Sequence, residues 1–341
     1  MRTIQIRRLS AVVAAGALAL SLAACSSGQE IGGAAAASGP KDGTLKIVYI
    51  QKQADQQYFV DEAAGAKAEA ERLGDVELTM VAVGTDSNAA ITAVNTAVAQ
   101  GADGVAIVVP DAKIGPQVAS ILDKAGIPYV ASDDPFNKAD GSRAPWVSID
   151  SLTMGKQIGE KAGTLYADAG WTAADTRIIS VMQEDQQVCQ DREKGQLEAF
   201  KTAGGEAPEV VRVGTDNSTP VALSKTGAAI TANQGVAHWV VVGCNDEGVT
   251  GSVKALENSG VSAGDVIGVG LGAYLACKDW KAGVDSGNKA ALYIDGRVDG
   301  AASVKVLVDH LRSGKAIPAE TLGKAVIVDA DTWEASGMLC G

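Results

Sequence analysis

Polar and aromatic side chains stand where short apolar runs of the sequence end. Lys52 follows the first such run and precedes the aromatic pair Tyr58 and Phe59, and Asp133 and Asp134 stand side by side after a later run. Carboxylates accept hydrogen bonds, ammonium groups donate them, and aromatic rings offer flat faces to the C–H surface of a sugar. Together these residue types suit the binding of a polyhydroxylated solute.

A second set of polar residues follows apolar runs further along the chain. Arg192 offers several donors in a rigid fork, which suits two neighbouring hydroxyl groups. Asn245 can provide one donor and one acceptor, whereas Asp246 is expected to be the N-cap of the next helix. The residues that we predict to contact a ligand are Lys52, Gln56, Tyr58, Phe59, Asp133, Asp134, Gln186, Arg192, Asn245, Tyr274 and Asp295.

The composition argues against several other kinds of site. Two histidines in the chain leave little room for a histidine metal site or a Ser-His-Asp triad. Asp133 and Asp134 are sequence neighbours, so their carboxyl groups would not readily face each other across a glycosidic bond. A net charge of −12 disfavours nucleic acid, because phosphate contacts need clustered Lys and Arg. We therefore predict a binding protein that is not an enzyme, with no cofactor, no metal and no nucleic-acid partner.

The elements that must position these residues alternate along the chain between strands and helices. The 341 residues, 46% of them hydrophobic, are enough for two domains. Apolar strands separated by amphipathic helices indicate parallel sheets buried on both faces, so we predict an α/β fold of two doubly wound lobes. Strands are predicted at 45–50, 78–83, 104–109, 128–132, 178–182, 210–213, 239–244, 266–269, 290–294 and 325–328. Helices are predicted at 58–73, 88–100, 114–125, 152–169, 193–204, 221–233, 247–259, 275–286 and 299–313.

The N-terminus has the pattern of an export signal. Arg2, Arg7 and Arg8 precede an apolar segment over 9–24, which is typical of a secretory signal peptide. The sequence Leu-Ala-Ala-Cys that ends at Cys25 resembles a bacterial lipobox, in which the cysteine becomes lipidated. Residues 1–24 are thus predicted to be a signal peptide and 25–43 a lipidated cysteine with a flexible tether. A helix-turn-helix of a transcription regulator would have to stand at this place, so the signal argues against that function.

Four cysteines follow Cys25, at 189, 244, 277 and 340. An even number permits full pairing in three ways, and an exported protein meets an oxidising compartment. The sequence also leaves buried free thiols open. We suggest a bridge between Cys244 and Cys277, or between Cys189 and either of them. No C-x-x-C motif occurs, so no thiolate zinc site is indicated.

The sequence resembles the periplasmic sugar-binding proteins of ABC transporters, and among them the arabinose-binding members. The stretches that carry the resemblance are 52–59, 109–115, 131–136, 238–246 and 263–270, within a match over 45–337. The resemblance implies two similar lobes, joined by three crossings, that close on a sugar and dock onto a permease. It also implies sugar contacts for Lys52, Tyr58, Phe59, Asp133, Asp134, Arg192 and Asn245.

The chain departs from the arabinose-binding pattern at four positions of the expected cleft. An acidic residue is replaced by Gln56 and a methionine by Cys244, and an Asn and an Asp of the last cleft loop fall on Gly272 and Leu275. A pentose would lose two polar partners, and unpaired hydroxyl groups weaken binding. The favoured ligand is therefore a four- or five-carbon alditol; a pentose is the alternative.

The resemblance also implies the domain arrangement and the partners. We expect one lobe to comprise 44–149 and 295–323 and the other 150–294 and 324–341, with crossings near 148–151, 294–296 and 322–325. The partners are a small sugar or alditol and the permease subunits, and the membrane is contacted only through the lipid anchor. We expect a monomer outside the cytoplasm. A lipoprotein that presents its ligand to a membrane kinase or chemoreceptor remains an alternative.

Overall fold

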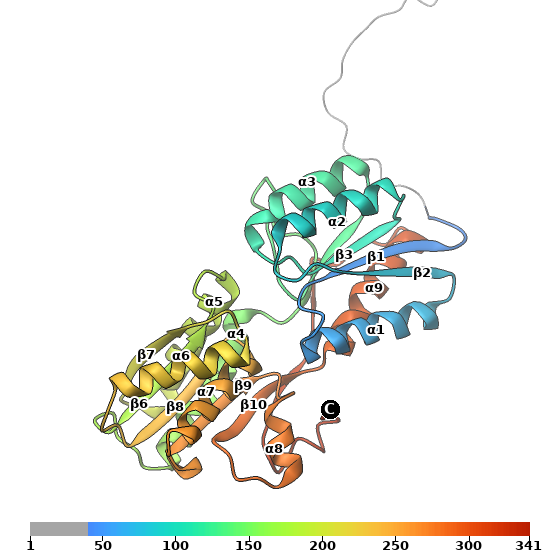
Figure 1. Ribbon diagram of the computed structural model, residues 1–341. Helices are drawn as coiled ribbons and strands as arrows, with labels where there is room; N and C mark the ends of the chain where they lie inside the picture. The colour runs from blue at the N-terminus through green and yellow to red at the C-terminus, as the bar shows by residue number, and fades with distance from the viewer. Residues whose placement is uncertain (1–39) are drawn as a thin grey trace, which may run out of the picture. The chain divides into compact units, whose positions relative to one another are not determined.

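The computed structural model describes residues 40–341, and the predicted signal peptide and Cys25 lie outside these residues. The strands are β1 (Leu45–Gln51), β2 (Val76–Ala82), β3 (Gly104–Ile107), β4 (Tyr129–Ser132), β5 (Trp146–Ser148), β6 (Thr176–Met182), β7 (Glu209–Gly214), β8 (His238–Gly243), β9 (Val266–Leu271), β10 (Asn288–Ile294), β11 (Glu320–Leu322) and β12 (Ala325–Val328). They form two six-stranded sheets, ordered β11-β5-β4-β3-β1-β2 and β12-β10-β9-β8-β6-β7 (Figure 1).

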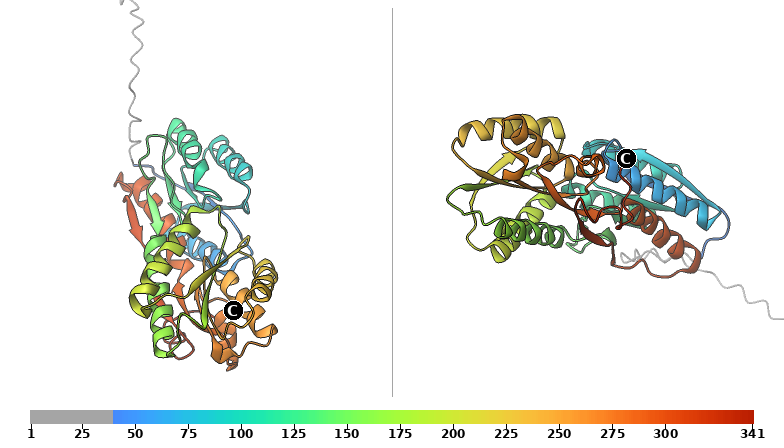
Figure 2. Two further views of the ribbon diagram at one scale, coloured as in Figure 1. Left: turned by 90° about the vertical axis from the view of Figure 1, so that its left-hand side faces the viewer. Right: turned by 90° about the horizontal axis from the view of Figure 1, so that it is seen from below.

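Helices alternate with the strands and pack on both faces of each sheet (Figures 1 and 2). They are α1 (Gln57–Leu73), α2 (Ser87–Ala99), α3 (Gly115–Ala125), α4 (Ser151–Asp168), α5 (Gln187–Gly204), α6 (Thr219–Ala232), α7 (Asp246–Asn258), α8 (Ala276–Ala282) and α9 (Gly296–Ser313), with short 3-10 turns η1 (Ala112–Ile114) and η2 (Ala263–Asp265). This alternation confirms the predicted α/β fold. We call each sheet with its helices a lobe.

The first lobe buries its sheet between two layers of helices. On one face, Val48 and Ile50 of β1 pack with residues of α2 and α3; on the other, Ile47 and Tyr49 pack with α1 and α9. Successive side chains of a strand point to opposite faces, so a strand buried on both sides has the near-continuous apolar sequence seen here. All strand pairs of this sheet are parallel.

The second lobe repeats this arrangement. Residues of α4 and α5 cover one face of the sheet, where Ile158 and Phe200 pack against Val240, and α7 covers the other with Val253 and Leu256. The strands pair in parallel except β12, which runs antiparallel to β10 at the edge. Because the strands are parallel, their carboxyl ends gather at one edge of each sheet, where the predicted site residues stand.

The chain passes between the two sheets three times. β5 belongs to the first sheet and β6 to the second; β10 lies in the second, β11 returns to the first, and β12 lies again in the second. The passages lie between β5 and α4, between β10 and α9, and between β11 and β12. The three-crossing hinge of the predicted fold is therefore present.

Apart from shifts of one to three residues, two strands and two helix ends differ from the prediction. Helix α5 begins at Gln187, six residues before the predicted start at 193. β5 and β11 have three residues each, too few for a periodic pattern, and they gain their stability from pairing with each other and with β4. Helix α8 ends at Ala282, before the predicted end at 286, because Gly283 adopts the left-handed conformation (φ 66°) that terminates helices.

Two disulfides join the four cysteines of the described residues. Cys189 pairs with Cys244, one of the suggested bridges, and Cys277 pairs with Cys340. The suggested bridge between Cys244 and Cys277 is therefore wrong, as is the open alternative of free thiols. The second bridge belongs to one of the three full pairings, but the sequence does not select it, because it depends on where the C-terminal segment folds back on α8. Within residues 40–341, none of the helices is long and apolar enough to cross a membrane.

Candidate functional site: a cavity between the strand ends of both lobes

A cavity lies where the carboxyl ends of the strands of the two lobes meet. It encloses about 840 Å³, part of which is open to solvent. Lys52, Tyr58 and Asp133 line it from the first lobe, and Arg192 and Asn245 line it from the second. Mostly apolar clefts with a few convergent polar groups are typical of small-molecule sites.

The first-lobe wall is built around a buried ion pair. Lys52 Nζ is paired with Asp134, and only 13% and 7% of their side chains are exposed. Lys52 follows β1 and Asp134 follows β4, and β3 lies between these strands in the sheet. The lysine Nζ also lies 5.7 Å from the centre of the Phe59 ring, within cation–π range. Both charged groups are thus fixed before a ligand arrives.

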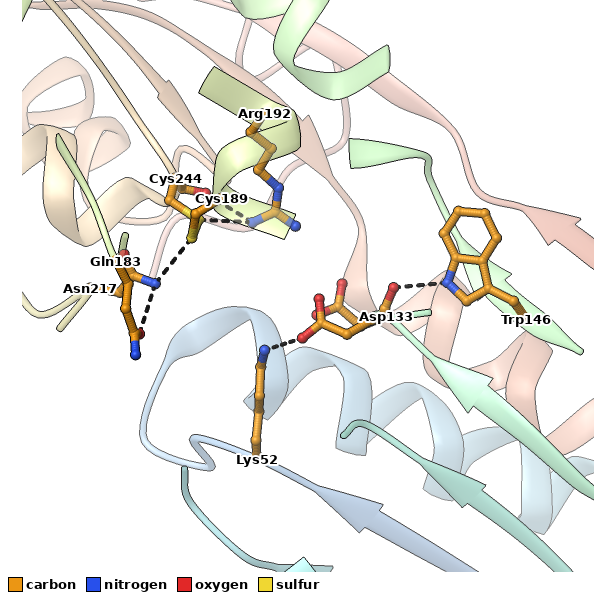
Figure 3. Close-up of polar contacts among 9 residues, drawn as sticks. Lys52, Asp133, Trp146, Gln183, Cys189, Arg192, Asn217 and Cys244 are labelled. Atoms are coloured by element: carbon orange, nitrogen blue, oxygen red, sulfur yellow. Dashed lines mark hydrogen bonds and ion pairs between the residues drawn. A yellow bond between two sulfur atoms is a disulfide. The ribbon is translucent and has the colours of Figure 1, made fainter. Parts of the chain in front are cut away.

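Asp133 is held in an unusual backbone conformation beside this pair. Its φ of 57° lies in the left-handed region, which aspartate tolerates better than most residues. Its N–H donates to the carbonyl of Val147 at 3.0 Å, and its carbonyl accepts from Trp146 Nε1 at 2.9 Å (Figure 3). The short strand β5, which carries both partners, therefore positions this carboxylate.

A buried group of acids lies next to Asp133. Burial and the charge of Asp134 raise the pKa of Asp133 to about 6, although Lys52 and Arg192 act in the opposite direction. Burial, and next the charge of Asp133, raise the pKa of Glu62 to about 8. Burial also raises the pKa of Asp299 to about 7. Charged forms are disfavoured in such surroundings, so Glu62 holds its proton at neutral pH, whereas Asp133 is mostly ionised there and Asp299 lies between the two.

Two of these acids, Glu62 and Asp299, accept hydrogen bonds from nearby hydroxyl groups. Ser132 Oγ donates to Glu62 Oε1 at 2.7 Å and lies 2.6 Å from Tyr49 Oη. Tyr58 Oη donates to Asp299 Oδ2 at 2.9 Å. Tyr58 also packs against hydrophobic clusters of both lobes. The aromatic pair Tyr58 and Phe59, whose rings meet edge to face at 5.2 Å, is thus fixed at the cavity floor.

The second-lobe wall carries Arg192 as its buried cation. Arg192 Nη1 donates to the carbonyl of Cys244 at 2.9 Å, and the side chain is 9% exposed. The guanidinium group points toward Asp133 of the first lobe (Figure 3). Opposite charges thus face each other across the cavity, which suits a ligand whose hydroxyl groups accept from one wall and donate to the other.

The prediction that Asp246 is the N-cap of α7 is wrong. Asn245, not Asp246, is the N-cap of α7, since its Oδ1 accepts from the Gly248 N–H at 3.0 Å. Its Nδ2 donates to the carbonyl of Asn217 and to Glu247 Oε2, both at 2.8 Å. Asp246 is the first residue of α7 and accepts from the Leu275 N–H at 2.5 Å. Asn and Asp are equally good N-cap residues, so the sequence alone does not show which of the two neighbours caps the helix.

The last strand-end loop presents apolar surface to the cavity. Gly272 has a φ of 113°, and a Cβ built there would lie 2.9 Å from the Tyr274 ring. Tyr274 Oη donates to the carbonyl of Ile294 at 2.6 Å, so its ring cannot easily move away. A side chain at position 272 would therefore be strained and would have to displace the Tyr274 ring.

The cavity gathers every predicted site residue except Asp295. Asp295 instead caps α9 through the Arg297 N–H at 3.1 Å and forms an ion pair with the Arg297 side chain at 2.8 Å. The Asp295 carboxylate is thus bound by Arg297 at the start of its own helix. The prediction missed Gln183, Cys189 and Asn217, which also line the cavity. Gln183 and Asn217 follow β6 and β7, so the strand-end rule applied to every strand would have found them.

Comparisons with known proteins agree with this architecture. The family model described as "Periplasmic binding protein domain" matches residues 47–316. The chain is 27% identical to the ABC transporter L-arabinose-binding periplasmic protein of Azospirillum brasilense over 93% of this chain and 95% of that protein. It is 28% identical to the L-arabinose-binding periplasmic protein of Escherichia coli (strain K12) over 67% of this chain and 70% of that protein.

A solved structure shares the fold. The myo-inositol binding protein of Caulobacter superposes with a TM-score of 0.74 at 21% identity, covering 87% of this chain and 97% of that one. The chain therefore belongs to the periplasmic binding protein family, and its two lobes with three crossings are those of the type I members. Members of this family are non-enzymatic transport components, which confirms the prediction that the chain is not an enzyme.

Proposed function

We propose that the chain binds a small sugar or sugar alcohol in the cavity and delivers it to the permease of an ABC importer. The observation that carries this proposal is the pair of opposed walls, with Asp133 and the Lys52–Asp134 ion pair on one side and Arg192 on the other. Hydrogen bonds to charged groups are stronger than those between neutral groups. The two relatives named for L-arabinose and the structure named for myo-inositol support a polyhydroxylated ligand.

A four- or five-carbon alditol such as threitol, erythritol, xylitol or arabitol is the favoured ligand. Gly272 has no side chain and Leu275 has no polar one, so the last loop offers few partners to a pyranose ring. A flexible alditol can place its hydroxyl groups along the polar walls instead. The relatives favour a pentose as the second candidate.

A thermal-shift screen of the purified protein tests this proposal. The panel contains pentoses, hexoses, myo-inositol and C4–C6 alditols, since a ligand that binds only the folded state raises the unfolding midpoint. We expect the largest increase with a C4 or C5 alditol. A larger increase with pentopyranoses would select the pentose alternative, and no increase with any member would contradict sugar or polyol binding. Asp134→Ala serves as a control, because a ligand that binds in the cavity should give a smaller shift with this variant, and an equal shift would place the binding elsewhere.

Binding is proposed to proceed by closure of the two lobes. We assign 44–149 with 295–323 to the first lobe and 150–294 with 324–341 to the second. A ligand that contacts both walls stabilises the closed arrangement, and rotation about three short crossings allows nearly rigid movement. The closed lobes, as a monomer, would then dock on the permease.

Membrane anchoring through Cys25 belongs to the same proposal. The lipobox-like sequence before this cysteine supports it. In cells that process lipoproteins, Cys25→Ala is expected to move the protein from the membrane fraction to the soluble fraction; an unchanged distribution would contradict the anchor.

Uptake of the labelled ligand in a deletion strain separates transport from sensing, because only a transport protein is needed for uptake.

A further inference from the structure

The Cys189–Cys244 disulfide lies in the wall of the cavity. Both cysteines line it and both are buried, with exposures of 1% and 2%. Cys189 stands in the first turn of α5, and Cys244 directly follows β8. The bond therefore joins the helix that carries Arg192 to the loop that carries Asn245.

Arg192 is attached to one end of this bridge. Its Nη1 donates to the Cys244 carbonyl at 2.9 Å and lies 3.5 Å from Cys244 Sγ. The same guanidinium group points toward Asp133 across the cavity (Figure 3). A shift of the Cys244 backbone would thus move the cation that faces the first-lobe acids.

Asn217 is attached to the other end. Its Nδ2 lies 3.6 Å from Cys189 Sγ and 3.4 Å from Gln183 Oε1, and its carbonyl accepts from Asn245 Nδ2 at 2.8 Å. Gln183, Asn217 and Asn245 stand in the loops after β6, β7 and β8 respectively. The disulfide therefore contacts the loops after β7 and β8 directly and reaches the loop after β6 through the Asn217–Gln183 hydrogen bond (Figure 3).

The Cys277–Cys340 disulfide has a different place. It joins α8 to the C-terminal segment and packs with Trp280, Trp333 and Met338. Neither of its cysteines lines the cavity. The two bridges close chain loops of similar length, with sequence separations of 55 and 63, so the entropic contribution to stability is similar for both.

We propose that the Cys189–Cys244 disulfide is a positioning element of the ligand site. It fixes Arg192 and the Asn217–Asn245 pair relative to one another and forms the apolar surface between them. Ligand affinity therefore depends on this bond and not on the Cys277–Cys340 bond. The inference rests on the proposed function, since it concerns the same cavity.

The test compares two double variants by isothermal titration calorimetry with L-arabinose, xylitol and myo-inositol. Cys189→Ser/Cys244→Ser is expected to raise the Kd of the tightest of the three at least about ten-fold. Cys277→Ser/Cys340→Ser is the matched control and is expected to change that Kd less than about two-fold, although both variants lower the unfolding midpoint. An unchanged Kd in the first variant, or equal losses in both, would overturn the inference.

A second measurement separates positioning from general loosening of the lobe. If the bridge acts through Arg192, its removal from an Arg192→Lys background weakens binding much less than its removal from the wild type. Equal losses in the two backgrounds would show that the bridge does not act through this residue. If the first double variant does not fold, the Cys277→Ser/Cys340→Ser variant replaces it. Its one remaining bridge, Cys189–Cys244, is reduced with a water-soluble phosphine, and the Kd is compared before and after reduction. A wild type that binds neither the three probes nor any member of the wider panel would contradict the proposed function as well.

Discussion

The two walls of the cavity are held in place by different forces. In the first lobe, Lys52 and Asp134 form a buried ion pair, and Glu62, Asp133 and Asp299 are acids whose pKa values burial raises. In the second lobe, a disulfide and hydrogen bonds to backbone carbonyls fix the polar side chains. The first wall therefore depends mainly on which groups carry charge, whereas the second wall, which also carries the charged Arg192, is held in addition by a covalent bond.

Because of this difference, the two walls are expected to respond to different perturbations. Buried charges are costly when a partner is removed, and buried acids respond to pH. The second wall also holds a buried acid, since burial raises the pKa of Asp246 to about 7, but its disulfide does not respond to pH in the neutral range. Substitutions in the two walls are thus expected to affect affinity, stability and pH dependence in different proportions.

The largest effect is expected for Lys52→Met. It leaves the Asp134 carboxylate buried without its counter-ion and removes a donor from the cavity. The unpaired carboxylate lowers the unfolding free energy. Loss of a charged donor to the ligand is expected to lower ligand affinity at least about a hundred-fold by calorimetry. The control is Lys113→Met, because Lys113 is 78% exposed and lies 3.6 Å from Asp111 on the surface. Equal affinities of wild type and Lys52→Met would show that the ion pair is not part of the site.

A smaller effect, on stability, is expected for Gly272→Ala in the second-lobe wall. The φ of 113° is unfavourable for alanine, and the new methyl group would meet the Tyr274 ring at 2.9 Å. Strain of this kind costs about 1–3 kcal/mol of unfolding free energy, measurable by denaturant titration. Gly227→Ala is the matched control: a Cβ there meets no atom within 4 Å, and alanine favours the helix α6. A Gly272 variant as stable as wild type would contradict the packing described here.

Glu62→Gln tests the response of the first-lobe wall to pH. The folded protein holds the Glu62 proton up to about pH 8, whereas the unfolded chain releases it near the ordinary value of about 4.5. Unfolding free energy should therefore fall as pH rises from about 5 to 8. The glutamine variant should show a shallower fall, by about 1 kcal/mol or more across this range. Parallel curves for the two proteins would contradict a raised pKa of Glu62.

The smallest effect is expected for Asp295→Asn, which lies outside both walls. The Asp295–Arg297 ion pair is about one third exposed, and such pairs contribute less than about 1 kcal/mol. Ligand affinity should stay within about two-fold of wild type, because Asp295 does not line the cavity. A loss comparable with that of Lys52→Met would restore the original prediction that Asp295 contacts the ligand.

Much of the fold followed from the sequence because buried parallel strands have continuous apolar runs. Residues after these runs gather at one edge of each sheet, which is why Lys52, Asp134 and Arg192 could be chosen in advance. Side-chain partners that depend on tertiary packing could not be predicted from the sequence. The Cys277–Cys340 bridge and the use of Asp295 by Arg297 depend on where the C-terminal segment and the start of α9 lie. Strand β5, three residues long, was missed although it positions Asp133.

A crystal structure with the tightest ligand of the sugar and polyol panel tests the central claim most directly. We expect the ligand to lie in the cavity with hydroxyl groups within hydrogen-bond distance of Asp133 or Asp134 on one wall and of Arg192 on the other. A ligand that contacts only one lobe, or that lies outside the cavity, would contradict the account.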